Sequence, residues 1–76
     1  MAMNKVIFDR QWKVIRGEFT ARWSLVGDFD LNRMDKAEDK YHRFVTMLQV
    51  KYGFTRQQAR EEIGKFWTEF KAGQTD

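Results

Sequence analysis

Apolar side chains recur at steps of three and four residues along most of this chain, which is the spacing of one face of an α-helix. The clearest such stripe ends at Tyr52 and is followed at once by Gly53, a residue that adopts positive φ at a helix end without steric cost. We therefore expect a helix from about Asp35 to Tyr52. Its buried face contains Tyr41, Phe44, Val45, Leu48 and Tyr52.

A second helix is predicted directly after this turn. Thr55 can cap the free N–H of Gln58, and the Gln58 side chain can reach back to the Thr55 N–H, which forms a capping box. The helix is expected to start at Arg56 and to end near Lys71. Its apolar face contains Ala59, Ile63, Phe66 and Phe70.

An earlier stripe predicts the first helix, from about Arg10 to Val26, with Asp9 as its N-cap and Gly27 at its end. Gly17 projects away from the apolar face, where a glycine costs up to about 1 kcal/mol relative to alanine. Two interpretations of this glycine stay open: another group approaches the backbone there, or the helix tolerates the weakness. The apolar face contains Trp12, Ile15, Phe19 and Trp23.

The residues between these two long helices form a polar segment. Asp28 or Asp30 can cap a short helical turn that runs through Met34. Two aspartates at alternate positions also begin a calcium-binding loop, but the sixth position of that loop lacks glycine, and Ala37 stands where a ligand is needed. We therefore favour capping over metal binding.

Together these patterns predict an all-α protein with three long helices and one short helical turn. Seventy-six residues make one small domain, so we expect residues 1–76 to form a single unit with a core of about residues 8–71 and frayed termini. Twelve aromatic residues compensate for the short length, because each buries roughly 150–250 Å². The residues singled out as structural are Trp12, Trp23, Tyr52, Gly53, Thr55 and Gln58.

The composition excludes several classes of protein. The chain has no Cys, so neither a disulfide framework nor a thiolate metal site can hold the fold, and this absence fits a reducing cytoplasm. The stretch from Met1 to Phe8 does not resemble a signal peptide, and no stretch approaches the roughly 20 apolar residues of a membrane span. We expect a cytoplasmic protein that does not enter a membrane.

The sequence offers little catalytic chemistry. His42 is the only histidine, and no Ser or Cys nucleophile pattern accompanies it. Glu61 and Glu62 are adjacent, so on a helix their side chains diverge by about 100°, whereas an acid–base pair needs opposed carboxylates in a cleft; Glu69 adds a third surface carboxylate. There is no glycine-rich phosphate loop and no HExxH pattern. We therefore predict no enzyme activity, no cofactor, no metal and no small-molecule ligand.

Three motifs follow one another along the chain. The first is Trp12–Phe19 (WKVIRGEF), completed by Trp23; the second is Asp28–Leu31 (DFDL); the third is Leu48–Ala59 (LQVKYGFTRQQA). In this order and spacing they resemble the CsbD-like family of small bacterial general stress-response proteins. The resemblance covers about residues 12–70, which is most of the chain.

The resemblance implies a small four-helix array related to SAM-like domains, in agreement with the helix count above. It implies expression under stress, but the family has no agreed biochemical activity and no catalytic residues, so none are carried over. Lys36 and Thr46 stand near positions where members usually have glycine. The chain therefore resembles a divergent member of the family.

Two kinds of binding function remain open. The first is an interaction module that acts by contact with a protein partner or by self-association. Its support is a surplus of apolar side chains at or beyond the edges of the stripes, since a contiguous patch of them would mark an interface. Burial of these side chains by a neighbouring helix is the alternative. They are Val14, Leu25, Met47, Val50 and Trp67.

The second hypothesis is nucleic-acid binding without sequence preference. Both outer segments of the chain are basic, whereas residues 27–40 are acidic. Lys13 and Arg16 can share a face of the first helix, while Arg56 and Arg60 lie at the N-terminal end of the last helix, where free N–H groups favour phosphate. Scattered surface charge is the alternative, and a net charge of +3 is modest for a nucleic-acid binder.

Overall fold

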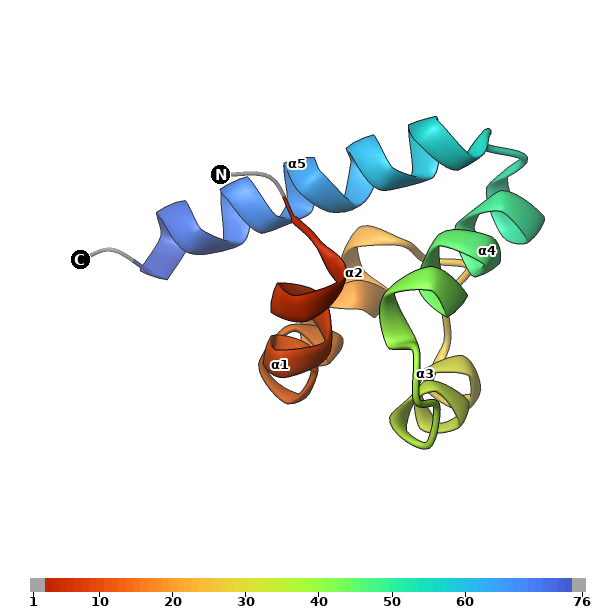
Figure 1. Ribbon diagram of the computed structural model, residues 1–76, viewed down its shortest axis with the longest axis horizontal. Coiled ribbons are helices and arrows are strands. Elements are labelled where there is room, and N and C mark those ends of the chain that lie inside the picture. Colours follow the sequence, from red (N-terminus) through yellow and green to blue (C-terminus); the bar gives the residue numbers. More distant parts are fainter. Residues whose placement is uncertain (1–2, 75–76) are drawn as a thin grey trace.

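The computed structural model describes residues 3–74, and every regular element within that range is helical. The predicted all-α fold is therefore confirmed. In Figure 1 the longest helix, α5, runs along the upper side of the molecule, and α1, α2 and α3 lie below it. The elements are α1 (Lys5–Ile15), the 3₁₀ turn η1 (Arg16–Glu18), α2 (Phe19–Arg22), α3 (Asp28–Asp35), α4 (Lys40–Tyr52) and α5 (Arg56–Gln74).

The corner between α4 and α5 follows the sequence closely. Gly53 has a left-handed backbone with a φ of 71°, and its N–H donates to the carbonyl of Gln49 at 3.0 Å. The Gln58 N–H donates to Thr55 Oγ1 at 3.0 Å, while the Thr55 N–H donates to Gln58 Oε1 at 2.9 Å. The predicted turn and capping box are confirmed. The predicted end of α5 near Lys71 is wrong, because the helix continues to Gln74.

The predicted start of the first helix is also wrong. Asn4 is the N-cap, and its Oδ1 accepts the Ile7 N–H at 2.9 Å, so α1 begins at Lys5 rather than Arg10. The carboxylate of Asp9 serves a different purpose, since it accepts the Tyr41 N–H at 3.1 Å and lies 2.6 Å from Lys5 Nζ. Asp9 therefore joins α1 to the first turn of α4. Of the termini predicted to fray outside residues 8–71, Met3 is buried, residues 5–7 belong to α1 and residues 72–74 belong to α5, while residues 1–2 and 75–76 lie outside the described residues.

The predicted continuous helix to Val26 is interrupted. The backbone tightens into η1 around Gly17, and α2 ends at Arg22 because Trp23 is extended, with φ −122° and ψ 93°. This change of direction carries the buried side chains of Trp23 and Val26 into the core. A Cβ at Gly17 would meet nothing within 4 Å, so no close approach in the described chain requires glycine at this position.

The starts of α3 and α4 also differ from prediction, and in both cases the reason is the identity of the N-cap residue. Gly27 does not end a helix; it is the extended N-cap residue of α3, and its N–H donates to the carboxylate of Asp30 at 3.2 Å. The helix predicted from Asp35 to Tyr52 starts only at Lys40, since Asp39 is its N-cap and accepts the His42 N–H at 3.3 Å.

The core is aromatic and lies between α1, α2, α4 and α5. Phe8, Phe19 and Phe44 are completely buried, and the rings of Phe19 and Phe44 stack with centroids 4.5 Å apart. Such ring pairs are worth about 0.5–1.5 kcal/mol beyond their buried area. Trp12 and Trp23 are buried as expected, whereas Tyr52 is half-buried and its hydroxyl accepts the Leu25 N–H at 3.0 Å.

Candidate functional site

An open groove of about 980 Å³ lies between α3, the loop that follows it, and the outer face of α4. The inner face of α4 carries the buried core residues of this helix, so its opposite face is free to line the groove. The yellow-green α3 and the green α4 lie next to each other in Figure 1 and make residue contacts. The wall that α4 and its N-cap residue provide includes Asp39, His42, Arg43, Thr46, Met47 and Val50.

Cationic side chains outnumber carboxylates in this groove, which we call the α3/α4 groove. Lys51 is paired with Asp30 at 3.1 Å, and the guanidinium of Arg33 lies over the exposed ring of Phe29 at 5.8 Å. Two further cations have no such engagement: within residues 3–74, the side chains of Lys36 and Arg43 make no hydrogen bond or ion pair and are exposed. With Asp39 as the second carboxylate, four Lys/Arg face two Asp.

The same groove has an apolar component. Val50, in the last turn of α4, is 79% exposed. Met47, one turn earlier, is half-buried against the core, and Met34 of α3 is buried beneath the groove. Apolar and cationic side chains therefore line the same groove, which can contact both the apolar and the charged groups of a partner.

Both carboxylates of the groove are stabilised in their charged form. Burial raises the pKa of Asp30, but the Gly27 N–H and the Lys51 ammonium outweigh burial and lower it. The hydrogen bond from the His42 ring at 2.7 Å lowers the pKa of Asp39, with the backbone of His42 and the charge of Lys5 acting in the same direction.

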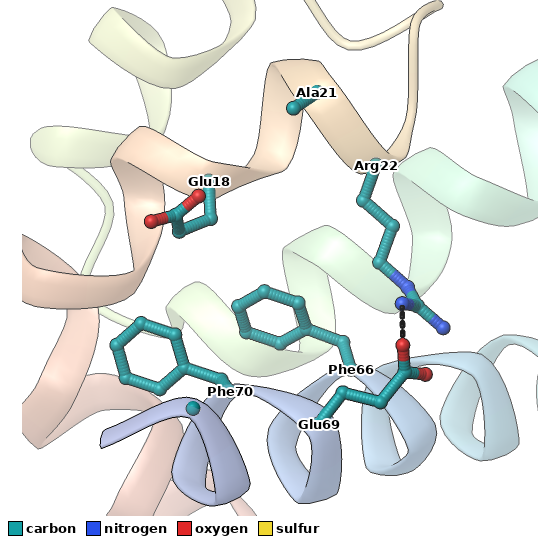
Figure 2. A pocket seen from close by; sticks show the side chains of 7 residues that line it. Glu18, Ala21, Arg22, Phe66, Glu69 and Phe70 are labelled. Carbon is teal, nitrogen blue, oxygen red and sulfur yellow. Dashed lines mark hydrogen bonds and ion pairs between the residues drawn. The ribbon is translucent and has the colours of Figure 1, made fainter. Parts of the chain in front are cut away.

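A second, smaller groove of about 520 Å³ lies between α2 and the C-terminal half of α5. Figure 2 shows Arg22 and Glu69 joined across it, with Arg22 Nη1 and Glu69 Oε1 3.1 Å apart. The Arg22 guanidinium also lies over the ring of Trp23 at 5.5 Å and that of Phe66 at 6.0 Å. The Arg22–Glu69 ion pair therefore links α2 to α5 across this groove.

The four predicted nucleic-acid contacts lie in two separate places: Lys13 and Arg16 at the end of α1 and in η1, and Arg56 and Arg60 at the start of α5. Lys13 and Arg60 are exposed, whereas Arg16 and Arg56 are half-buried and engaged within the chain. Arg16 Nε lies 2.8 Å from the carboxylate of Asp35, and Arg56 Nη1 donates to Gln49 and Thr46 at 3.1 and 3.4 Å. In Figure 1 the start of α5, in cyan, lies far from α1, in red. A single basic face from these residues is not present, and their role in binding stays a prediction.

The five apolar residues predicted at the edges of the helical stripes differ in how far they are buried. Trp67 is buried in the core and Met47 is half-buried, so a neighbouring helix covers the first completely and the second in part. Val14, Leu25 and Val50 remain exposed. Among these five, only Met47 and Val50 line the α3/α4 groove.

Sequence reasoning did not identify Lys36 and Arg43 as parts of a site. The available signal was the outer face of the helix ending at Tyr52, where Arg43, Met47 and Val50 follow one another at steps of four and three. Lys36 reaches the α3/α4 groove because the chain turns after α3, and this turn was not predicted from the sequence.

Across residues 3–74, no three His, Cys, Asp or Glu side chains gather in a way that could hold a metal ion. In the same part of the chain, none of the helices combines the length and the apolar character needed to cross a bilayer.

Comparison with known proteins gives distant but consistent relatives. No family model and no solved structure matches the chain. The UPF0337 protein of Bordetella pertussis is 32% identical over 65 residues, covering 86% of this chain and 94% of that protein. The UPF0337 protein of Pseudomonas aeruginosa is 31% identical over 64 residues, covering 84% and 94%. This chain belongs to the UPF0337 family, which is the CsbD-like family that its motifs resemble.

Proposed function

We propose that this protein is a non-enzymatic module of the bacterial general stress response that acts by contact with another protein. The stress-response part of the proposal is supported by the resemblance to the CsbD-like family. The contact part is supported by one observation: in the α3/α4 groove, exposed Val50 and half-buried Met47 lie on the same surface as the unpaired cations Lys36 and Arg43. Apolar side chains surrounded by polar groups occur at interaction sites, and Val50 with Met47 provides the apolar part of this groove.

The non-enzymatic part is supported by the way the candidate catalytic groups are used. The ring of His42 is hydrogen-bonded to Asp39, which caps α4. Glu62 lies 3.6 Å from Lys65 and Glu69 is paired with Arg22, so both carboxylates take part in surface ion pairs. The side chains of His42, Glu62 and Glu69 therefore each have a structural partner, and this engagement supports a non-enzymatic role.

The test is complementation of a host strain from which the gene has been deleted, scored as survival under an imposed stress. Val50→Asp places a charge in the groove, while Val6→Asp places the same charge on α1, where Val6 is 63% exposed and outside the groove. Both positions are exposed, so circular dichroism should show two folded variants. We expect Val6→Asp to restore survival and Val50→Asp to fail. Restoration by both variants would reject the proposed function.

Self-association is one form of the same proposal, in which the partner is a second copy of the chain. Sedimentation of the purified protein over a wide concentration range distinguishes the two forms. A mass that rises with concentration in the wild type and stays monomeric in Val50→Asp would assign the α3/α4 groove to a homo-oligomer. A constant monomeric mass assigns it to a different protein.

A further inference from the structure

We infer that the α3/α4 groove binds one face of an acidic amphipathic helix, an inference that rests on the proposed function and names the chemistry of the partner. The groove has the length of a short helix, unpaired positive charge at its rim and apolar side chains between the charges. Each of these three features restricts the occupant.

The length of the groove follows from α4. The lining residues that α4 and its N-cap contribute run from Asp39 to Lys51 at steps of three and four, which corresponds to about 18 Å at a rise of 1.5 Å per residue. A partner helix of roughly 12 residues spans the same distance. Ridges formed by such steps are the surfaces against which a second helix packs.

The charges favour a partner with carboxylates. Lys36 and Arg43 have no partner for their side chains within residues 3–74, whereas the two aspartates of the groove are already engaged. Asp30 is paired with Lys51, and Asp39 accepts a hydrogen bond from the His42 ring. The groove therefore presents net positive charge, and Glu or Asp side chains on a partner helix would complement it.

The apolar side chains favour a helix over a nucleic acid. Val50 is 79% exposed and needs an apolar partner to leave water, which a phosphate backbone does not supply. Met47 lies one turn before Val50 on the same face of α4, and its flexible thioether adapts to different apolar surfaces. Leu or Ile side chains at steps of three and four on the partner would cover both residues.

The probe is a fluorescently labelled peptide of Glu, Leu and Ala, about 15 residues long, in which every Leu lies on one face of the helix. A matched peptide has the same composition in an order that spreads Leu around the helix, and a third peptide carries Lys in place of Glu. By fluorescence anisotropy we expect saturable binding of the first peptide, about tenfold weaker binding of the second and no binding of the third.

The matched protein variants carry equal changes of charge. Lys36→Glu with Arg43→Glu reverses the two unpaired cations of the groove, and Lys13→Glu with Arg60→Glu reverses two exposed cations elsewhere. We expect the first double variant to bind the amphipathic peptide about tenfold more weakly, and the second to change affinity less than about twofold. Circular dichroism confirms that both variants are folded.

Three results would overturn the inference: equal binding of the two acidic peptides, equal weakening by the two double variants, or tighter binding of a random DNA duplex that is lost in Lys36→Glu with Arg43→Glu. If no peptide binds while Val50→Asp still fails in cells, the acidic helix is rejected and the protein-contact function stands. If Val50→Asp restores survival, the proposed function itself is rejected.

Discussion

The carboxylate of Asp30 lies 3.1 Å from Lys51 Nζ, and this ion pair ties the first turn of α3 to the last turn of α4. The same oxygen, Oδ2, accepts the Gly27 N–H, so one side chain closes the start of α3 and links it to α4. Because both helices line the α3/α4 groove, the Asp30–Lys51 pair links its two walls.

Replacing Asp30 with Asn should lower the free energy of unfolding by roughly 1 kcal/mol at neutral pH, because the charge pair is lost while an oxygen remains for the Gly27 N–H. The pKa of Asp30 is lowered in the folded state, so its charge stabilises the fold above the ordinary pKa of about 3.9. This contribution is lost as the pH falls through the folded pKa. Urea denaturation should show a difference between wild type and Asp30→Asn that is constant from pH 7 to 5 and shrinks below pH 4.

Asp28→Asn is the control, since Asp28 is an exposed acid in the same first turn of α3. This substitution removes only the favourable interaction of a negative charge with the helix dipole. It should cost a few tenths of a kcal/mol. A difference between wild type and Asp30→Asn that does not change with pH would contradict the assigned ion pair.

Replacing Gly53 with Val should destabilise the protein by about 1–2 kcal/mol, because the φ of 71° at this position is strained for a β-branched residue. Gly64→Ala should do the opposite. Gly64 lies inside α5, a Cβ there meets nothing within 4 Å, and alanine is better than glycine in a helix by up to about 1 kcal/mol. Thermal unfolding of both variants provides the measurement, and an unchanged midpoint for Gly53→Val would remove the basis of the α4–α5 corner.

Replacing Trp12 with Phe should cost about 2 kcal/mol. Trp12 is buried, and its Nε1 donates to the carboxylate of Asp35 at 2.6 Å, so the variant loses a link between α1 and α3 as well as buried volume. Val14→Ala, on the exposed side of α1, should stay within about 0.5 kcal/mol of wild type. Chemical denaturation that shows equal stability for both variants would contradict the role given to Trp12.

A labelled random DNA duplex should not bind saturably at physiological salt. Lys13 and Arg60 are exposed but lie on separate helices, and Arg16 and Arg56 are engaged within the chain, so few phosphates can be neutralised at once. Anisotropy at low and physiological salt measures this directly. Saturable binding at physiological salt that is lost in Lys13→Glu with Arg60→Glu would instead support the nucleic-acid hypothesis.

The sequence was sufficient to predict those parts of the fold that depend on interactions between residues close together in the chain. Gly53, Thr55 and Gln58 predicted a turn and a capping box because the groups involved are at most a few residues apart. The helical stripes predicted most of the core for the same reason. The all-α class and the buried positions of Trp12 and Trp23 followed from those stripes.

The remaining errors come from contacts between residues distant in the chain. Asp9 is a good N-cap by type, but its carboxylate is occupied by Tyr41, 32 residues away, and Asn4 caps α1 instead. The groove was missed for a similar reason. Lys36 belongs to a segment that is acidic in sequence and Arg43 to one that is basic, and only the packing of α3 against α4 brings them to one surface.

Photo-crosslinking in living cells under stress tests the central claim most directly, with a photoreactive amino acid placed at position 50 in the groove or at position 6 outside it. We predict a discrete protein adduct from position 50 that disappears when Lys36→Glu and Arg43→Glu are added, and no such adduct from position 6. The same set of adducts from both positions, or an adduct from position 50 that nuclease removes, would contradict the claim that this protein acts through protein contact at the α3/α4 groove.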